Sequence, residues 1–119
     1  MKLIDITETQ EKIYTNTEDE NKPVFTLRKL TAGEVESIND STSGLDEKNR
    51  LMYLGGTSIR LKIKYALVSW KNIVDSSGKE VSCNDVNKEK LPPAVALWLS
   101  REIDELSGLL GISEDVKKN

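Results

Sequence analysis

Few residues in this chain have the types and the spacing that catalysis requires. The 119 residues contain no histidine, which removes the commonest general base and excludes Ser-His-Asp and Cys-His sites within the chain. Two carboxylate pairs, Asp75 with Glu80 and Asp104 with Glu105, could perform acid–base chemistry if one pKa of a pair were raised. Asp75 belongs to a turn rich in serine and glycine, and the other pair consists of neighbours on a predicted helix that point different ways. We interpret all four acids as structural, and we predict that the chain is not an enzyme.

Metal, nucleotide and thiol sites are also poorly supported. Cys83 is the single cysteine, so it forms neither an intrachain disulfide nor a thiolate cluster, and no histidine is available to activate it. The acidic stretch 15–22 lacks the Asp-x-Asp-x-Asp-Gly pattern of calcium loops. The Gly55-Gly56 pair matches neither glycine-rich phosphate-binding motif and is typical of the end of a helix. We therefore predict no cofactor and no metal, and a partly buried position for Cys83.

Composition and charge exclude further classes of protein. With 17 basic and 20 acidic residues the formal charge is −3, whereas nucleic-acid binders usually carry a basic excess or stripe. Arg60, Lys62 and Lys64 form the longest basic stretch, which could meet a phosphate but is more typical of a solvated face. No apolar run approaches 18 residues, and Asp5 interrupts the apolar residues at the start of the sequence. We predict neither a nucleic-acid nor a membrane partner, and a location in the cytoplasm.

The clearest local pattern in the first half of the chain is a strand followed by a helix. Residues 24–30 alternate as a strand does, with Phe25 and Leu27 on one face. Thr31-Ala-Gly-Glu34 is a capping box, in which the threonine and the glutamate each satisfy a free backbone N–H of the first helical turn. The sequence therefore predicts a short helix that starts after Thr31.

The middle of the chain is predicted to be helical. Asp46 can cap a helix that runs to Leu54 and ends at Gly55-Gly56. Residues 57–74 show two competing periods: alternation in the first half, as in a strand, and a period of 3.6 over the whole length, as in a helix. We predict a helix, with Trp70 in the core; the alternative for Trp70 is an exposed anchor for a partner.

The last third of the chain is predicted to return through a turn at residues 75–78 and then to form the best helix of the sequence. This helix begins at Pro92-Pro93 and carries its apolar residues at spacings of three and four. Trp98, Leu99 and Ile103 belong to its apolar face.

Together these elements predict one α+β domain over residues 1–119, small and dominated by helices. A short antiparallel sheet is expected near residues 24–30 and 73–82, with the long C-terminal amphipathic helix packed on residues 58–72. Residues 15–22 are predicted to form a flexible acidic loop, because such a polar stretch buries too little apolar surface to order itself, and the charged tail 113–119 is predicted to fray.

A family resemblance adds to this reading. Residues 65–119 contain Trp70 followed by the turn Asp75-Ser-Ser-Gly-Lys79, an extended stretch, the helix start Leu91-Pro-Pro93 and an acidic helix before a charged end at Asn119. This combination resembles small proteins from the structural gene clusters of tailed phages. The strand and capping box from Phe25 to Glu34 resemble the N-terminal part of tail-assembly chaperones, which accompany the tail tube and the tape measure during tail building.

The resemblance implies a phage or prophage virion-assembly protein, non-enzymatic, that acts as a tail-assembly chaperone in the host cytoplasm or stays in the virion. Its partner would be a tail-tube or tape-measure protein, and a homo-oligomer is compatible with it. We expect Trp70, Trp98, Leu99 and Ile103 to be core or partner-contact residues. The alternatives are a small phage-encoded inhibitor or anti-defence protein, and a structural subunit such as a head–tail connector or a tail terminator.

Overall fold

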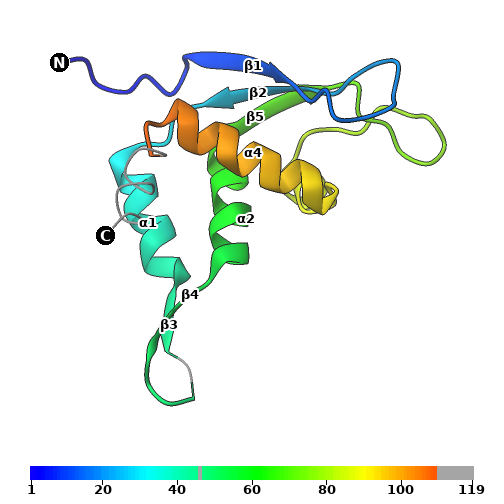
Figure 1. The fold of residues 1–119 in the computed structure, drawn as a ribbon. Coiled ribbons are helices and arrows are strands. Elements are labelled where there is room, and N and C mark those ends of the chain that lie inside the picture. The colour runs from blue at the N-terminus through cyan, green and yellow to red at the C-terminus, as the bar shows by residue number, and fades with distance from the viewer. Residues whose placement is uncertain (46, 110–119) are drawn as a thin grey trace.

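Three antiparallel strands form a sheet, and the helices lie on one side of it (Figure 1). The computed structural model describes residues 1–45 and 47–109. The elements in chain order are β1 (Thr9–Ile13), β2 (Val24–Arg28), α1 (Ala32–Thr42), β3 (Ser43–Leu45), β4 (Leu51–Tyr53), α2 (Gly55–Ala66), β5 (Leu67–Lys71), α3 (Asp85–Lys88) and α4 (Pro93–Leu106). The sheet has the order β1-β2-β5, so the central strand is β2. This is the small α+β fold that the sequence predicted, with its C-terminal helix.

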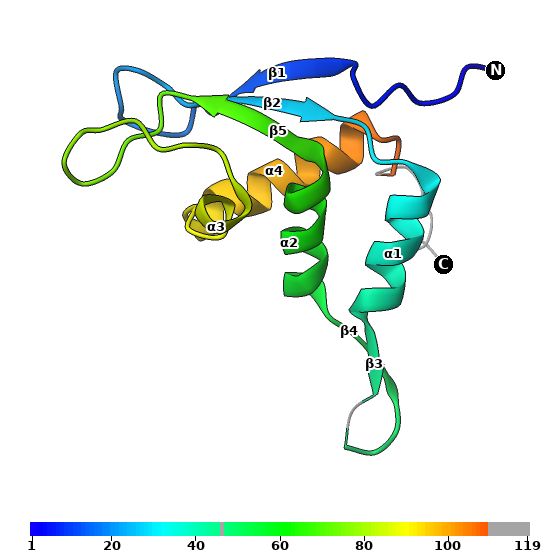
Figure 2. The ribbon, with the colours of Figure 1, turned by 180° about the vertical axis from the view of Figure 1, so that it is seen from behind.

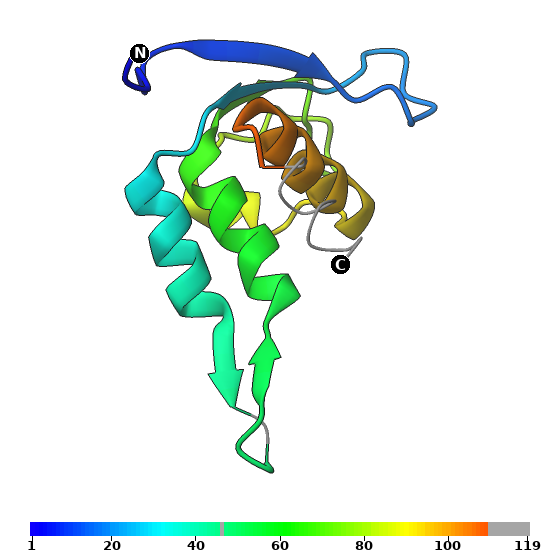
Figure 3. The same ribbon diagram turned by 60° about the vertical axis from the view of Figure 1, so that its left-hand side comes forward.

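Among residues 1–45 and 47–109, the helices cover one face of the sheet and none lies on the other face. Helix α4 lies directly against the sheet, whereas α1 and α2 lie side by side, and the short hairpin β3–β4 connects them at their ends far from the sheet (Figures 2 and 3). Helix α4 also packs against α2, as predicted. The core lies between the sheet and the helices, and its completely buried large apolar side chains come from β2, β5 and α4: Phe25, Leu27, Leu67, Leu99 and Ile103.

The predicted strand and capping box are confirmed. Phe25 and Leu27 face the core from β2. The Thr31 hydroxyl accepts a hydrogen bond from the Glu34 backbone N–H at 3.2 Å, and the Glu34 carboxylate accepts one from the Thr31 N–H at 2.9 Å. Arg28 adds two donors from the end of β2, at 2.8 and 2.6 Å from the two Glu34 oxygens. The Arg28 guanidinium is the main reason why the pKa of Glu34 lies below its usual value.

This carboxylate makes the stability of the fold depend on pH. Because the pKa of Glu34 is lower in the folded than in the unfolded chain, its charge stabilises the fold above the usual glutamate pKa and ceases to do so as the pH falls through the folded value. Glu34→Gln keeps an acceptor for the cap, so we expect it to lower the free energy of unfolding by about 1 kcal/mol at neutral pH and by progressively less below about pH 4. Urea unfolding across this range measures the difference.

The matched control is Glu36→Gln, which removes the charge of an exposed glutamate on the same helix. We expect it to change the free energy of unfolding by less than about 0.5 kcal/mol at every pH. A Glu34→Gln deficit that stays constant down to acidic pH would contradict the assignment.

The predicted helix ending at Gly55-Gly56 is wrong. Residues 51–53 form β4, and the two glycines begin α2. The reason is long-range pairing: the Leu54 N–H donates to the Thr42 carbonyl at 2.7 Å, and β4 pairs with β3, so the backbone of this segment is committed to a hairpin. The predicted cap Asp46 lies outside the described residues.

The predicted helix over residues 57–74 is right in its first half and wrong in its second. Helix α2 ends at Ala66, and residues 67–71 pair with β2 as strand β5. Leu67 lies opposite Leu27 and Trp70 opposite Phe25, so both face the core from the sheet. Pairing with β2 overrode the helical period of this segment, whose apolar residues fit a strand as well as a helix.

The sheet has one strand more than predicted, and only β2 lies where a strand was expected. Its outer strands are β1, which the sequence analysis missed, and β5; residues 73–82 contribute one isolated bridge between Val74 and Glu80. Two further predictions are confirmed: residues 75–78 form a turn, and α4 begins at Pro93. Residues 15–22 contain neither helix nor strand. The predicted tail 113–119 lies outside the described residues. Among the described helices, none is both long and apolar enough to cross a membrane.

Candidate functional site

Four aromatic side chains meet at one end of the core. Phe25 is at the centre: its ring centroid lies 6.4 Å from that of Trp70 and 5.9 Å from that of Trp98. Tyr14 packs edge-on against Trp98 with a centroid distance of 5.2 Å. These contacts join the end of β1, β2, β5 and α4, and such edge-to-face pairs add stability beyond the area that they bury. We refer to these four residues as the aromatic cluster.

Trp70 ties the strand β5 to the segment that follows it. Its indole N–H donates a hydrogen bond of 2.7 Å to the carbonyl of Val81, and the Val81 N–H donates to Ile73 at 2.9 Å. The polar atom of the half-buried indole is therefore satisfied, and the return of the chain after the 75–78 turn is fixed against the sheet. Trp70 therefore packs against the core with one side and is partly exposed on the other.

The four residues predicted as core or contact positions fall into two groups. Leu99 and Ile103 are completely buried and belong to the core alone. Trp98 and Trp70 are partly buried, and both join the aromatic cluster. Tyr14 was not singled out by the sequence analysis, because it follows a strand that was itself missed; its buried position between two elements had no local signal.

A hollow of about 770 Å³ opens beside the aromatic cluster. Tyr14, Phe25, Trp70 and Val95 contribute to its lining, which is drawn from residues 14–25, 70–75, 80–82 and 87–95. We call it the aromatic hollow. Its charged lining residues are three acids and one lysine: Asp19, Asp75, Glu80 and Lys90. Tyr14 and Phe25 are buried, so Trp70 is the ring of the lining that a ligand can touch. A partly exposed tryptophan with a polar, mostly acidic rim suits a protein ligand that inserts an apolar side chain.

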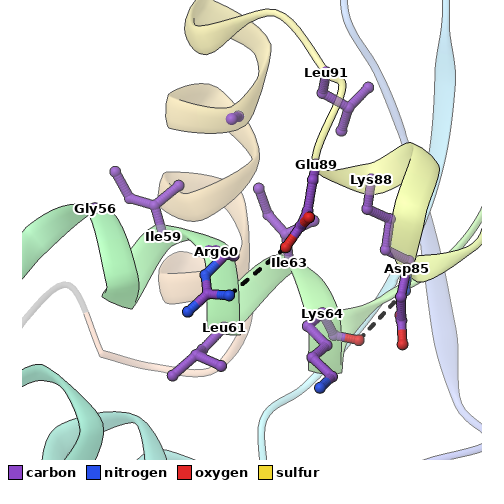
Figure 4. A pocket seen from close by; sticks show the side chains of 11 residues that line it. Gly56, Ile59, Arg60, Leu61, Ile63, Lys64, Asp85, Lys88, Glu89 and Leu91 are labelled. Carbon is purple, nitrogen blue, oxygen red and sulfur yellow. Dashed lines mark hydrogen bonds and ion pairs between the residues drawn. The ribbon is translucent and has the colours of Figure 1, made fainter.

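A second hollow, of about 530 Å³, lies between α2, α3 and the start of α4 (Figure 4). Its charged residues are largely paired with one another. Arg60 lies 3.6 Å from Glu89, and Lys88 lies 3.7 Å from Asp85 and donates to the carbonyl of Lys64 at 3.3 Å. Two of the three cations in this lining are matched by its own acids, which leaves the hollow little attraction for a phosphate.

The basic stretch of the sequence is divided between two sides of α2. Arg60 and Lys64 line the hollow of Figure 4, whereas Lys62 faces α4 and pairs with Asp104. The three cations therefore do not form one stripe.

Asp75 and Cys83, which the sequence analysis considered for catalysis, have contacts typical of structural residues. The Asp75 carboxylate accepts hydrogen bonds from the Ser77 hydroxyl at 2.6 Å and from two backbone N–H groups, and these bonds lower its pKa, which suits a turn and not a proton donor. Burial raises the pKa of the Cys83 thiol, which makes it less reactive. Among residues 1–45 and 47–109, no group of three acidic, cysteine or histidine side chains could hold a metal ion.

Comparison of the chain with protein-family models, with curated proteins and with solved structures finds no match.

Proposed function

We propose that this chain is a non-enzymatic assembly protein of a tailed phage or prophage that acts as a tail-assembly chaperone and binds a virion subunit through the aromatic hollow. One observation supports this above the others. The segments that carry the family resemblance are far apart in the sequence, yet they meet at the hollow: Phe25, Trp70, Asp75, Leu91 and Pro92 all line it. A shared surface is what a shared partner requires.

The chemistry of the hollow suits the shielding of an apolar segment. A partner side chain placed against Trp70, the partly exposed ring of the lining, removes apolar surface from water on both proteins, which contributes roughly 25 cal/mol per Å². The acidic rim and the formal charge of −3 keep the free protein dissolved while this surface is unoccupied. A chaperone of this kind works in the host cytoplasm, and its partner is a tail-tube or tape-measure protein.

The test is a tagged pull-down from cells in which the source phage or prophage grows, read by mass spectrometry. The variant is Val74→Glu, which places a charge in the lining of the hollow at a side chain that is 55% exposed. We expect the unchanged protein to recover the tail-tube or tape-measure protein, and Val74→Glu to recover at least tenfold less, because the partner would have to desolvate the new carboxylate. Purified virions should not contain the protein.

The matched control is Val86→Glu, the same change at a side chain on α3 that is 66% exposed and lines neither hollow. It should recover the partner as well as the unchanged protein does. Equal loss in both variants would contradict the assigned surface. Presence of the protein in virions would favour a structural subunit, and recovery of a host defence protein alone would favour an inhibitor.

A further inference from the structure

Two loops at the same end of the sheet contribute to the lining of the aromatic hollow (Figures 1 and 2). The first loop, residues 14–23, joins β1 to β2 and contributes Thr17, Asp19 and Pro23 among others. The return loop, residues 72–82, follows β5 and contributes residues from both of its ends. The shape of the hollow therefore depends on how these two loops are held relative to each other.

The return loop is attached to the body of the protein. The Trp70 indole N–H donates to the Val81 carbonyl, and the two sides of the loop are bridged between Val74 and Glu80. Ile73, at the start of the loop, packs against the core. These contacts give the return loop a fixed position beside the sheet.

The first loop has weaker attachments of its own. The Tyr14 N–H donates to the Pro23 carbonyl at 2.9 Å, which closes the base of the loop, and the Lys22 ammonium donates to the Thr17 carbonyl at 2.7 Å. Both bonds lie within the loop. Residues 15–22 are polar throughout, and such a stretch buries too little apolar surface to order itself against the body. A bond to another part of the molecule is therefore needed to hold this loop in one place.

Asn72, the first residue of the return loop, supplies that bond. Its side-chain amide donates to the Lys22 carbonyl at 3.0 Å, and among residues 1–45 and 47–109 this is the one hydrogen bond that joins the two loops. The backbone of Asn72 is left-handed, with a φ of 64°. Glycine adopts this conformation with the least strain, and asparagine is one of the few other residues that adopt it regularly. An asparagine here therefore permits the turn out of β5 and also provides the donor that reaches the first loop.

We propose that Asn72 is a positioning residue for partner binding, because it holds the first loop where Thr17 and Asp19 complete the lining of the aromatic hollow. The inference rests on the proposed function, since it takes this hollow as the site where the partner binds. A loop that is already ordered does not have to be ordered when the partner arrives, and this raises the affinity without any added contact. Loss of the bond between Asn72 and Lys22 should therefore weaken binding while the core of the protein stays as it is.

Relaxation measurements by nuclear magnetic resonance test whether the bond holds the loop. Asn72→Asp replaces the donor amide by a carboxylate of the same shape, and Asn72→Gly removes the side chain but keeps the left-handed backbone. We expect the backbone order parameters of residues 15–22 to fall from about 0.8 to about 0.6 or below in both variants. The matched controls are Asn49→Asp and Asn49→Gly, at an exposed asparagine with a φ of 60° that lines neither hollow, and they should leave these values unchanged. Order parameters that are already below about 0.6 in the unchanged protein, or that stay high in the Asn72 variants, would overturn the proposal.

The tagged pull-down from phage-producing cells tests whether the held loop matters to the partner. Asn72→Asp and Asn72→Gly should each recover at least about threefold less tail-tube or tape-measure protein than the unchanged protein, and the two Asn49 variants should recover as much. All four variants change exposed residues and should unfold at similar urea concentrations, so that a loss of recovery does not come from unfolding.

Two results separate this inference from the function on which it rests. Equal recovery by the Asn72 and the Asn49 variants would overturn the role of Asn72 and leave the proposed function standing. Recovery of no tail-tube or tape-measure protein by the unchanged protein would contradict the proposed function, and the role of Asn72 in binding would fall with it.

Discussion

Replacing Leu99 with alanine should lower the free energy of unfolding by about 3–4 kcal/mol. Leu99 is 0% exposed and lies on α4 where this helix meets the sheet, so the shortened side chain leaves a cavity that close-packed neighbours cannot fill. The same substitution at Leu97, two residues earlier on the same helix but 54% exposed, should cost less than about 0.5 kcal/mol. Urea unfolding monitored by circular dichroism measures both values.

Comparing Leu99→Ala with Leu97→Ala decides whether Leu99 is a core residue or a partner-contact residue, which the sequence leaves open. A completely buried side chain reaches a partner only if the helix moves, so a large loss of stability at Leu99 assigns it to the core. An equal loss at Leu97 would show that α4 is more deeply buried than the structure has it. A small loss at Leu99 would contradict the packing of α4 against the sheet.

The elements that could be predicted are those whose determinants lie within a few residues of one another. The Thr31–Glu34 capping box, the turn stabilised by Asp75 and the helix that begins at Pro93 each depend on contacts no more than one turn away. Such devices do not depend on long-range contacts, so their residue types are sufficient evidence.

The strands at the two sides of the sheet could not be predicted in the same way. Leu67–Lys71 has side chains that satisfy a helix as well as a strand, and what decides between them is pairing with β2, about 40 residues earlier in the chain. Thr9–Ile13 is mostly polar and exposed, because it lies at the edge of the sheet, and so it lacks the alternation that marks a half-buried strand.

The candidate site was predictable only in part for the same reason. Trp70 and Trp98 stand out as large side chains in apolar segments. Tyr14 and the aromatic hollow depend on four segments meeting after folding, and no spacing within any one of them marks the meeting point. Sequence patterns identify the residues that can contribute to such a surface, whereas the tertiary fold decides which of them do.

Removing either partner of the ion pair between Lys62 and Asp104 should cost about 2 kcal/mol. Lys62 on α2 donates to one carboxylate oxygen of Asp104 on α4 at 3.0 Å and lies 2.9 Å from the other, and the two side chains are only 15% and 16% exposed. Lys62→Met keeps the apolar stem but leaves a carboxylate without its cation, and Asp104→Leu leaves an ammonium without its anion; an uncompensated charge in such a site is costly. Urea unfolding of the two variants measures the loss.

The double variant decides what this pair does for the fold. When Lys62→Met and Asp104→Leu are combined, no uncompensated charge remains, and two apolar side chains meet between α2 and α4. We therefore expect the free energy of unfolding to return to within about 1 kcal/mol of the unchanged protein, because the attraction of a buried pair roughly offsets the cost of removing both ions from water. A double variant as unstable as the sum of the two single ones would instead assign net stability to the pair.

The exposed pair of the same helix is the control for both results. Arg60 and Glu89 lie 3.6 Å apart and are 58% and 59% exposed, so water screens their attraction and receives either charge when the other is removed. Arg60→Met and Glu89→Leu should each change the free energy of unfolding by less than about 0.5 kcal/mol, with little coupling between them. The two cations are two residues apart on α2, so a large difference between the two cycles comes from the deeper burial and the closer contact of the Lys62–Asp104 pair. In that case the packing of α2 against α4 requires both charges of the Lys62–Asp104 pair or neither. The Arg60–Glu89 pair at the end of α3 then contributes little to stability.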